Sequence, residues 1–364
     1  MGRVLKFGVA CGGTGGHIFP GLATAGALAE RGHDVTLWLA GKDVEHDAIK
    51  AWQGDILTVP SEGFQFGFSL RSLQTVVKLR KAYRLSIGLM REQAPHAMLA
   101  MGSYASFGPV RAAAKFDIPY VLHEANLVPG RAVSLLARKA DTIAVSFDRT
   151  GSYMKHGNIV TTGMPLRKAL EIASRQPRSM RAPEDGLRVL VMGGSRGAQI
   201  LNETVPNAIA AAAAKGLRLQ VEHIAGLQDK ESLEAVYAEL GTKARVHHFV
   251  QDMEAKYLAA DLAICRSGAA TCAELAAFGV PALLVPYPHA VRNHQMSNAR
   301  VLQDSGAADV VAQEDLTDTW LRDYLINVSQ KPARLQAMST AMKKQAQPDA
   351  ASRLADLLER VAGA

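Results

Sequence analysis

The chain has 364 residues, enough for two ordinary α/β domains and more than one hydrophobic core usually serves. Hydrophobic residues make up 48% and charged residues 21%, and the apolar runs fall short of the ~18 residues of a membrane helix. The net charge of +7 favours an anionic partner. The three cysteines, Cys11, Cys265 and Cys272, lack metal-ligand spacing and favour reduced thiols in the cytosol over a disulfide framework. We expect neither a secretory signal nor a membrane span.

Along the first half of the chain, short apolar runs alternate with segments whose apolar residues recur at the spacing of an α-helix. The predicted helices include 21–31 and 70–92, and the predicted strands are Val4–Cys11, Asp34–Ala40, Asp55–Pro60, Ala97–Met101, Tyr120–His123, Thr142–Ser146 and Ile159–Thr162. Continuous apolar strands joined by helices predict a parallel sheet covered on both faces.

The second half repeats this plan after a polar stretch, 174–186, that separates the halves. Its predicted strands are Arg188–Met192, Gln220–Ile224, Val246–Val250, Leu262–Cys265, Ala282–Val285 and Ala308–Val311. We predict two doubly wound domains, 1–165 and 166–364, that face a cleft holding the chemistry. The tail, 331–364, reads as two helices broken at Gln347-Pro348, the last of which is expected to pack back on the first domain.

The run Gly12-Gly13-Thr14-Gly15-Gly16-His17 follows the first strand and opens a helix. Glycines let backbone N–H groups approach an anion, and a helix N-terminus adds favourable partial charge. The spacing does not fit GxGxxG, and Ala40-Gly41 stands where a dinucleotide site has an acid at the end of the second strand. No Lys-Ser/Thr pair makes a Walker loop. A tight structural turn explains only part of this composition.

Further strand-end loops carry small and hydroxylated residues. The run from Gly193 to Ala198 repeats the glycine arrangement in the second half, and the run from Met101 to Ser106 is a third such loop. The paired glycine loops predict two anionic ligands.

Three further side chains are candidates for chemistry. Glu274, in a helix after the run beginning at Arg266, could accept two hydrogen bonds from a ribose diol or be an ordinary surface carboxylate. His17 could act as a general base, and the pair His123-Glu124 at the end of another strand could orient His17 or replace it. Lone histidines are more often simply hydrogen-bonded, so the base role is a hypothesis.

A basic segment runs from Gly63 to Arg91 without an acidic residue. Its basic residues are Arg71, Lys78, Arg80, Lys81, Arg84 and Arg91, interleaved with aliphatic and aromatic residues that include Phe64, Phe66 and Phe68. The pattern suits an anionic membrane surface, and it equally suits an amphipathic helix that packs on its own core with a solvated basic face.

Eight ordered segments resemble the MurG family of UDP-N-acetylglucosamine transferases of peptidoglycan synthesis. They cover nearly the whole chain and read GGTGGHIFPGLA, MGSYASFGP, HEANLVPG, TGMPLR, GGSRGA, FVQDM, CRSGAATCAE and NHQMSNA. The resemblance implies the GT-B fold and transfer of N-acetylglucosamine from UDP-N-acetylglucosamine to the C4 hydroxyl of the lipid I muramyl group, with inversion. It implies no cofactor or metal, no nucleic-acid partner, and a peripheral location at the cytoplasmic face of the plasma membrane.

The resemblance also assigns residues to the two substrates. It places the donor in the second domain, with Ser195 near the diphosphate, Glu274 at the ribose, the backbone of Val250 at the uracil and Arg167 close to the nucleotide. The other predicted donor residues are Ala269, Ala270, Thr271, Cys272 and Ala273, which offer N–H groups to phosphate, and His294 and Gln295, which bind the sugar. Thr14, Gly15, Gly16 and Asn126 are assigned to the sugar and the acceptor, which is undecaprenyl-pyrophosphoryl-muramyl-pentapeptide.

The chain departs from the family's common patterns at Ala125, Met164 and Arg196. Arg196 adds a charge beside the expected diphosphate. Two rival functions are a different GT-B lipid glycosyltransferase, such as a diacylglycerol glycosyltransferase, and a non-catalytic nucleotide-binding module.

Overall fold

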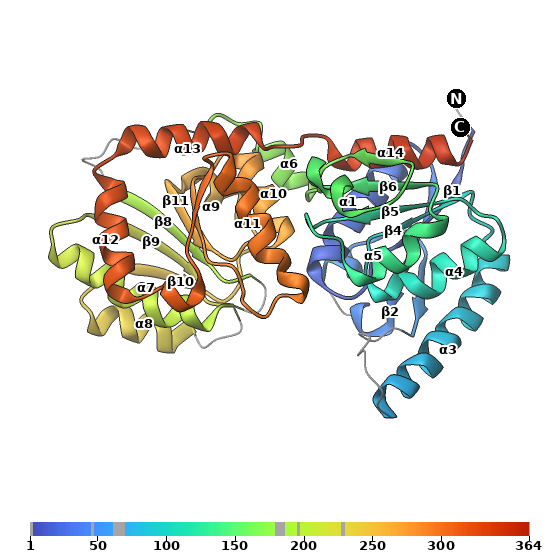
Figure 1. The fold of residues 1–364 in the computed structure, drawn as a ribbon, viewed down its shortest axis with the longest axis horizontal. Helices are drawn as coiled ribbons and strands as arrows, with labels where there is room; N and C mark the ends of the chain where they lie inside the picture. The colour runs from blue at the N-terminus through green and yellow to red at the C-terminus, as the bar shows by residue number, and fades with distance from the viewer. Residues whose placement is uncertain are drawn as a thin grey trace. The chain divides into compact units, whose positions relative to one another are not determined.

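A computed structural model describes residues 3–44, 47–60, 70–178, 186–194, 197–226 and 230–363, with the backbone only at residues 42 and 70–76. The chain divides into two compact units, residues 1–168 with 347–364, and residues 169–346. Both units consist of a sheet with helices packed against it (Figure 1).

The first unit contains a parallel sheet, seven-stranded within the described residues, in the order β3-β2-β1-β4-β5-β6-β7. Its strands are β1 (Lys6–Ala10), β2 (Asp34–Ala40), β3 (Ile56–Val59), β4 (Ala97–Ala100), β5 (Tyr120–Glu124), β6 (Thr142–Val145) and β7 (Ile159–Thr161). Its helices are α1 (Gly15–Glu30), α2 (Asp47–Lys50), α3 (Leu70–Gln93), α4 (Phe107–Lys115), α5 (Arg131–Leu136) and α14 (Ala350–Val361). Helix α6 (Lys168–Ala173) begins at the last residue before the boundary and lies otherwise in the second unit.

Alternate strand residues of the first unit are buried on opposite faces of the sheet. Val9 and Leu37 join a core with α1 and α14, whereas Ala10 and Trp38 join a core with α3, α4 and α5. A sheet buried on both faces needs apolar residues at consecutive positions, which explains why these strands read as continuous apolar runs.

The second unit contains a parallel sheet, six-stranded in the part of the chain that the structure describes, in the order β10-β9-β8-β11-β12-β13. Its strands are β8 (Leu187–Met192), β9 (Leu219–Ile224), β10 (Ala244–His247), β11 (Leu262–Cys265), β12 (Ala282–Leu284) and β13 (Ala308–Val310). Its helices are α7 (Gln199–Ala214), α8 (Lys230–Glu239), α9 (Met253–Ala259), α10 (Ala269–Phe278), α11 (His294–Asp304), α12 (Asp318–Ser329) and α13 (Pro332–Lys344). One core joins β8 and β9 to α7, α8 and α12.

Each predicted strand is present, with ends that differ from the prediction by up to three residues. The strand predicted over Val246–Val250 is β10, which ends at His247 because its pairing with β9 ends at Ile224. The helix predicted over 21–31 is α1, which begins at Gly15, so Pro20 lies inside it. Thr14 has the extended backbone of an N-cap residue, and Pro20, the sixth residue of α1, has no N–H to donate to the Gly16 carbonyl one turn earlier.

The polar stretch predicted to separate the halves is partly packed on the second unit. The Arg178 guanidinium donates to the carbonyl oxygens of Ala260 and Gly279, the latter at 2.9 Å, and to Ser339 Oγ at 2.9 Å. The chain instead passes between the units near residues 168 and 346. Residues 179–185 lie outside the described ranges.

The last helix, α14, belongs to the first unit, where it runs beside α1 (Figure 1). Its Leu354 and Leu358 side chains are fully buried in the core that contains α1. Its outer side is tied to the turn between α1 and β2, because Glu359 pairs with Arg31 at 2.8 Å and with His33 at 2.9 Å. The C-terminal segment therefore completes the fold of the N-terminal unit.

Replacing Leu358 with alanine is expected to lower the free energy of unfolding of the first unit by about 2–5 kcal/mol, because it removes a fully buried side chain and leaves a cavity. Leu135→Ala is the matched control, since Leu135 is 63% exposed and its loss should cost less than about 0.5 kcal/mol. Unfolding in urea is followed by tryptophan fluorescence in variants that also carry Trp320→Phe. The remaining tryptophans, Trp38 and Trp52, both lie in the first unit, so the signal reports on that unit alone. Equal effects of the two substitutions would contradict the packing of α14.

Candidate active site

The predicted glycine loop of the first unit lies at the carboxyl end of β1, where α1 begins. Gly13 has φ +118°, a conformation that favours glycine, and its N–H donates to Asp43 Oδ2 at 2.7 Å. A Cβ atom at Gly12 would lie 2.6 Å from both the Ala40 nitrogen and Asp43 Oδ2. Glycine is therefore needed at both positions: a side chain at Gly12 would collide with the end of β2, and the backbone conformation of Gly13 is unfavourable for other residues.

Asp43 was not among the predicted site residues, because Ala40-Gly41 stands directly after β2. The 3-10 turn Gly41–Asp43 brings the carboxylate back to the glycine loop, where it is buried. Its negative charge beside Gly12 and Gly13 disfavours an anion there, since like charges repel strongly at short range. The N-terminus of α1 after Thr14 is the part of this loop that suits an anionic ligand.

His17 lies in the first turn of α1 with a half-buried side chain. Its Nδ1 is 2.9 Å from Thr14 Oγ1. Burial lowers the pKa of His17 to about 4, although the nearby Asp43 carboxylate acts in the opposite direction. The imidazole is therefore neutral at pH 7 and can accept a proton at one ring nitrogen.

The loop after β4 and the last residues of β5 place two buried polar atoms at the carboxyl edge of the sheet. Ser103 Oγ and His123 Nδ1 have no hydrogen-bond partner among the described residues. His123 Nε2 lies 3.0 Å from the Gly163 carbonyl, so it carries the proton and donates, and burial lowers the His123 pKa to about 4. Buried polar atoms without partners are rare in proteins, so this edge suits a polar ligand.

Asn126 is fixed by the buried carboxyl group of Glu124. The backbone N–H and side-chain amide of Asn126 both donate to Glu124 Oε1, at 2.9 and 3.3 Å. Gly130 N–H donates to Glu124 Oε2 at 2.7 Å. Burial raises the pKa of Glu124 despite these hydrogen bonds. Glu124 therefore sets the shape of the loop on which Asn126 lies.

Arg167 lies in the first unit, with its guanidinium carbon 5.2 Å from the centre of the Phe19 ring on α1. Phe19 also lies against Gly15, where a Cβ atom would be 3.2 Å from the ring. This cation–π contact places Arg167 beside the same helix N-terminus as Thr14 and Gly16. Its predicted contact with the nucleotide stays a prediction.

The second glycine loop follows β8 in the second unit. Gly197 has φ +74°, and a Cβ atom there would lie 2.2 Å from the Ala225 carbonyl oxygen. Its N–H donates to the Gly194 carbonyl at 2.9 Å. Glycine is therefore required where this tight turn meets the end of β9. Ser195 and Arg196, predicted near the diphosphate, lie outside the described residues.

The predicted phosphate-binding turn is the start of α10. Gly268 is the N-cap residue, and no side chain caps the helix. The first N–H groups of an α-helix lack intrahelical partners, which suits an anion. Ala269, Ala270, Thr271 and Ala273 are partly buried, and Cys272 is buried.

The three cysteines are buried and free of disulfides. Burial raises the pKa of Cys11 and of Cys272 to about 12, and it raises the pKa of Cys265 well above the usual value for a thiol. Each side chain is therefore a protonated thiol at neutral pH, and buried free cysteine packs as a small apolar side chain.

Glu274 lies on α10 and is partly buried. The hydroxyl of the fully buried Tyr257 donates to its Oε2 at 2.6 Å. Glu274 is therefore not an ordinary solvated surface carboxylate, because a buried side chain fixes one of its oxygens.

The start of α11 carries the predicted sugar-binding residues. Gln295 Oε1 accepts a hydrogen bond from Tyr287 N–H at 2.9 Å, and its backbone carbonyl accepts one from Ser267 Oγ at 2.8 Å. His294 Nδ1 is 2.7 Å from the Val291 carbonyl. The contact with Ser267 joins the start of α11 to the loop that precedes α10.

The structure thus places the described site residues at the carboxyl ends of two sheets. Thr14, Gly15, Gly16, His17 and Asn126 lie at this edge in the first unit, and Glu274, His294 and Gln295 lie in helices that follow strands of the second. Val250 is buried in the segment between β10 and α9. Ligands of open parallel sheets bind at this edge.

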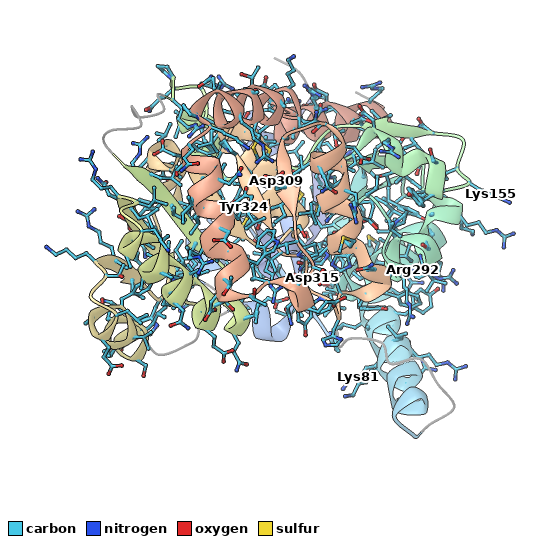
Figure 2. The ribbon with its side chains drawn as sticks, turned by 60° about the vertical axis from the view of Figure 1, so that its left-hand side comes forward. Lys81, Lys155, Arg292, Asp309, Asp315 and Tyr324 are labelled. Atoms are coloured by element: carbon cyan, nitrogen blue, oxygen red, sulfur yellow. The ribbon has the colours of Figure 1, made fainter. Side chains whose placement is uncertain are left out.

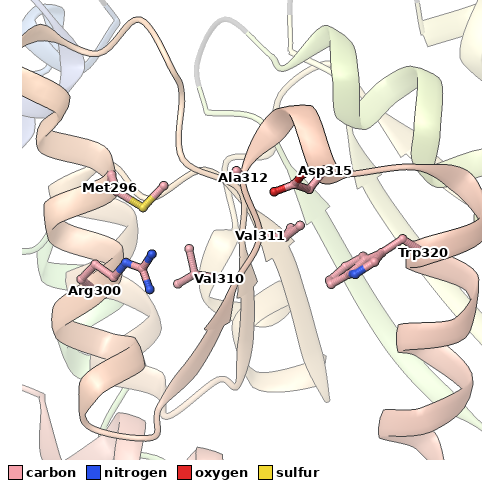
Figure 3. Close-up of a pocket in the computed structure, with 7 residues that line it drawn as sticks. All are labelled: Met296, Arg300, Val310, Val311, Ala312, Asp315 and Trp320. Carbon is pink, nitrogen blue, oxygen red and sulfur yellow. The ribbon is translucent and has the colours of Figure 1, made fainter.

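A cavity of about 540 Å³ lies in the second unit along β13 (Figure 3). Arg300 and Met296 extend into it from α11, and Trp320 lies on α12. None of the described residues predicted to bind substrate lines this cavity, so it is not part of the candidate active site.

Family models match both halves of the chain. Residues 7–145 match the glycosyltransferase family 28 N-terminal domain, and residues 188–354 match its C-terminal domain. With the two parallel sheets, these matches define a GT-B glycosyltransferase.

Curated proteins from two bacteria match over almost their full lengths. Both are named UDP-N-acetylglucosamine--N-acetylmuramyl-(pentapeptide) pyrophosphoryl-undecaprenol N-acetylglucosamine transferase. The protein from Cupriavidus metallidurans is 39% identical over 98% of this chain and 98% of its own. The protein from Shewanella loihica is 38% identical over 95% of this chain and 94% of its own.

A solved structure, MurG of Acinetobacter baumannii, superposes with a TM-score of 0.80 at 29% identity, covering 98% of this chain and 99% of its own. The chain belongs to the MurG family of N-acetylglucosamine transferases.

Proposed function

We propose that this chain transfers N-acetylglucosamine from UDP-N-acetylglucosamine to the C4 hydroxyl of the muramyl group of lipid I, which forms lipid II for peptidoglycan. The relatives named for this transfer, similar along almost the whole chain, carry the proposal. They do not favour the alternative of a diacylglycerol glycosyltransferase.

The donor is assigned to the second unit and the acceptor to the first. The Tyr257-bound carboxylate of Glu274 suits the ribose diol, because a carboxylate accepts more than one hydrogen bond. The N-terminus of α10 suits the donor diphosphate. In the first unit, the N-terminus of α1 and the unpartnered atoms Ser103 Oγ and His123 Nδ1 suit the acceptor.

The reaction is a direct displacement at the anomeric carbon. The C4 hydroxyl attacks, UDP leaves, and the configuration inverts. His17, neutral at pH 7, takes the hydroxyl proton, and helix N-termini stabilise the charge that develops on the departing diphosphate.

Release of UDP in the presence of different donors and acceptors tests this assignment. UDP-N-acetylglucosamine with a short-chain lipid I analogue should give release, and replacing the donor with UDP-glucose or the acceptor with diacylglycerol should not. Release with diacylglycerol alone would assign the chain to another lipid glycosyltransferase.

The protein is further proposed to work at the cytoplasmic face of the plasma membrane, bound peripherally through residues 63–91. Among the described residues, no helix is both long and apolar enough to cross a membrane. Residues 63–69, including Phe64, Phe66 and Phe68, lie outside the described ranges, and side chains are described from Val77 onward.

Helix α3 carries an outward face that supports membrane binding. The helix extends away from the rest of its unit, and Lys81 points outward from it (Figures 1 and 2). Its inner side buries Ala82 and Met90 in the core, whereas Val77 is 59% and Leu85 43% exposed. Exposed apolar residues beside exposed Lys78, Lys81 and Arg84 suit an anionic lipid surface.

Replacing Arg80, Lys81 and Arg84 together with glutamate is expected to weaken binding to anionic vesicles by at least about tenfold, since each basic residue near such a surface contributes about 1 kcal/mol. The control variant has the same change in net charge, but on the second unit, where the exposed Lys215, Arg218 and Lys243 are replaced with glutamate. Co-sedimentation with phosphatidylglycerol vesicles measures both variants. If the α3 variant binds these vesicles as tightly as the wild type, the proposed membrane-binding role of α3 is wrong.

A further inference from the structure

The side chain of Tyr257 connects three elements of the candidate donor site. Tyr257 lies on α9, and its ring stacks on Phe278 of α10 with centroids 5.1 Å apart and an interplanar angle of 28°. Its hydroxyl lies 3.6 Å from Met192 Sδ at the end of β8 and donates to Glu274 Oε2 at 2.6 Å. Met192 directly precedes the second glycine loop. One buried hydroxyl therefore lies between the end of β8 and the helix that carries Glu274.

The hydrogen bond from Tyr257 restricts the carboxylate of Glu274. A hydroxyl that donates to a carboxylate at this distance makes a short, charge-assisted hydrogen bond. Tyr257 is 0% exposed, and its stacked ring cannot follow a rotating Glu274 side chain. The position of Oε2 is thus set by the packing of α9 against α10. Recognition of two adjacent ribose hydroxyls depends on such fixed geometry, because a carboxylate that changes rotamer loses both hydrogen bonds.

We propose that Tyr257 is a positioning residue for the nucleotide: its hydroxyl holds Glu274 in the orientation that receives the ribose diol of the donor. This proposal rests on the proposed role of Glu274. Tyr257 acts through Glu274 and takes no part in the chemical step. Removing its hydroxyl therefore weakens nucleotide binding and leaves kcat at saturating donor nearly unchanged.

The chain offers a matched control in Tyr237. This tyrosine is also buried in the second unit, at 2% exposure, and its hydroxyl lies 2.9 Å from His223 Nδ1. His223 Nε2 in turn lies 3.0 Å from Asn202 Oδ1, so the hydrogen bond of Tyr237 belongs to a separate network. Tyr237→Phe and Tyr257→Phe each remove one buried hydroxyl. Only the second removes a hydrogen bond to Glu274.

The test measures dissociation constants of UDP and 2′-deoxy-UDP by calorimetry, which needs no acceptor. Tyr257→Phe is expected to weaken UDP binding by about tenfold, and to weaken 2′-deoxy-UDP binding less, because that ligand has only its 3′-hydroxyl contact to lose. Tyr237→Phe should leave both constants within about twofold. If Tyr257→Phe weakens both ligands equally, or neither, its hydroxyl does not position a ribose contact and the proposal fails.

A Glu274→Ala variant separates failure of this proposal from failure of the donor assignment. If Glu274→Ala weakens UDP binding but Tyr257→Phe does not, the ribose contact stands and the positioning role is wrong. If Glu274→Ala itself leaves UDP binding unchanged, the ribose assignment and the role of Tyr257 both fail. In the double variant, Tyr257→Phe should add less than about twofold to Glu274→Ala, because the two residues act as one unit.

Discussion

Replacing Glu274 with alanine is expected to lower kcat/KM for UDP-N-acetylglucosamine by about two to three orders of magnitude. Two hydrogen bonds from the ribose diol to a charged group would be lost, each contributing about 1.5–2 kcal/mol, the lower part of the usual range for a charged acceptor. The substitution also leaves the buried Tyr257 hydroxyl without the acceptor it has at 2.6 Å. Because the ribose is remote from the reacting carbon, most of the loss should appear in KM.

Steady-state kinetics with a lipid I analogue measure this effect, and Glu239→Ala is the control. Glu239 is an exposed carboxylate at the end of α8 in the same unit, so its loss should change kcat/KM less than about twofold. Glu274→Gln should fall between wild type and alanine, because the amide still accepts hydrogen bonds but lacks the charge. A Glu274→Ala enzyme with normal KM would contradict the donor site described here.

Replacing His17 with alanine is expected to lower kcat at saturating substrates by about 10²–10⁴-fold, the usual contribution of a general base. The base form is the neutral imidazole, and burial lowers the His17 pKa to about 4. His17 is therefore unprotonated throughout the range from pH 6 to 8. Activity should therefore fall as the pH is lowered toward 4, where His17 becomes protonated. Between pH 8 and pH 6, protonation of His17 should not reduce the activity.

Asp43 gives a second test of the same assignment. Its charge raises the pKa of His17, so Asp43→Asn should move the acidic limb of the pH–rate profile to still lower pH and reduce kcat. The pH–rate profiles of kcat/KM for wild type and this variant measure the shift. If His17→Ala keeps most of its turnover at saturating substrates, His17 is not the base. A limb near pH 6.5 that disappears in His17→Ala would contradict the low pKa.

The strands were predictable because both sheets are buried on both faces. Val9 and Ala10 of β1 lie in different cores, so both positions must be apolar, and the same holds for Leu37 and Trp38 of β2. The end of β10 was misplaced because Val250 is buried in a loop, and burial alone does not distinguish a strand from a packed connection. The helix predicted over 21–31 covers only the later part of α1, whose first turn is the end of the glycine loop that was predicted to open a helix.

The glycine loops were found from sequence, but the side chains that shape them were not. Asp43 reaches Gly13 only through the turn that follows β2, and no spacing rule places an acid there. Tyr257 reads in sequence as an ordinary core residue of α9, and its hydrogen bond to Glu274 depends on how α9 packs against α10. Such pairs arise from tertiary packing between segments that are distant in the chain, which a local pattern cannot encode.

Transfer of labelled sugar to lipid I is the direct test of the proposed reaction. UDP-N-acetylglucosamine labelled in the sugar would be incubated with a short-chain lipid I analogue, and the product isolated and its linkage determined by NMR. The expected product is a disaccharide lipid joined through the muramyl C4 oxygen, with the β configuration that inversion of an α-linked donor produces. An α-linked product, or label that never reaches the lipid although the folded protein binds UDP, would contradict the proposed reaction.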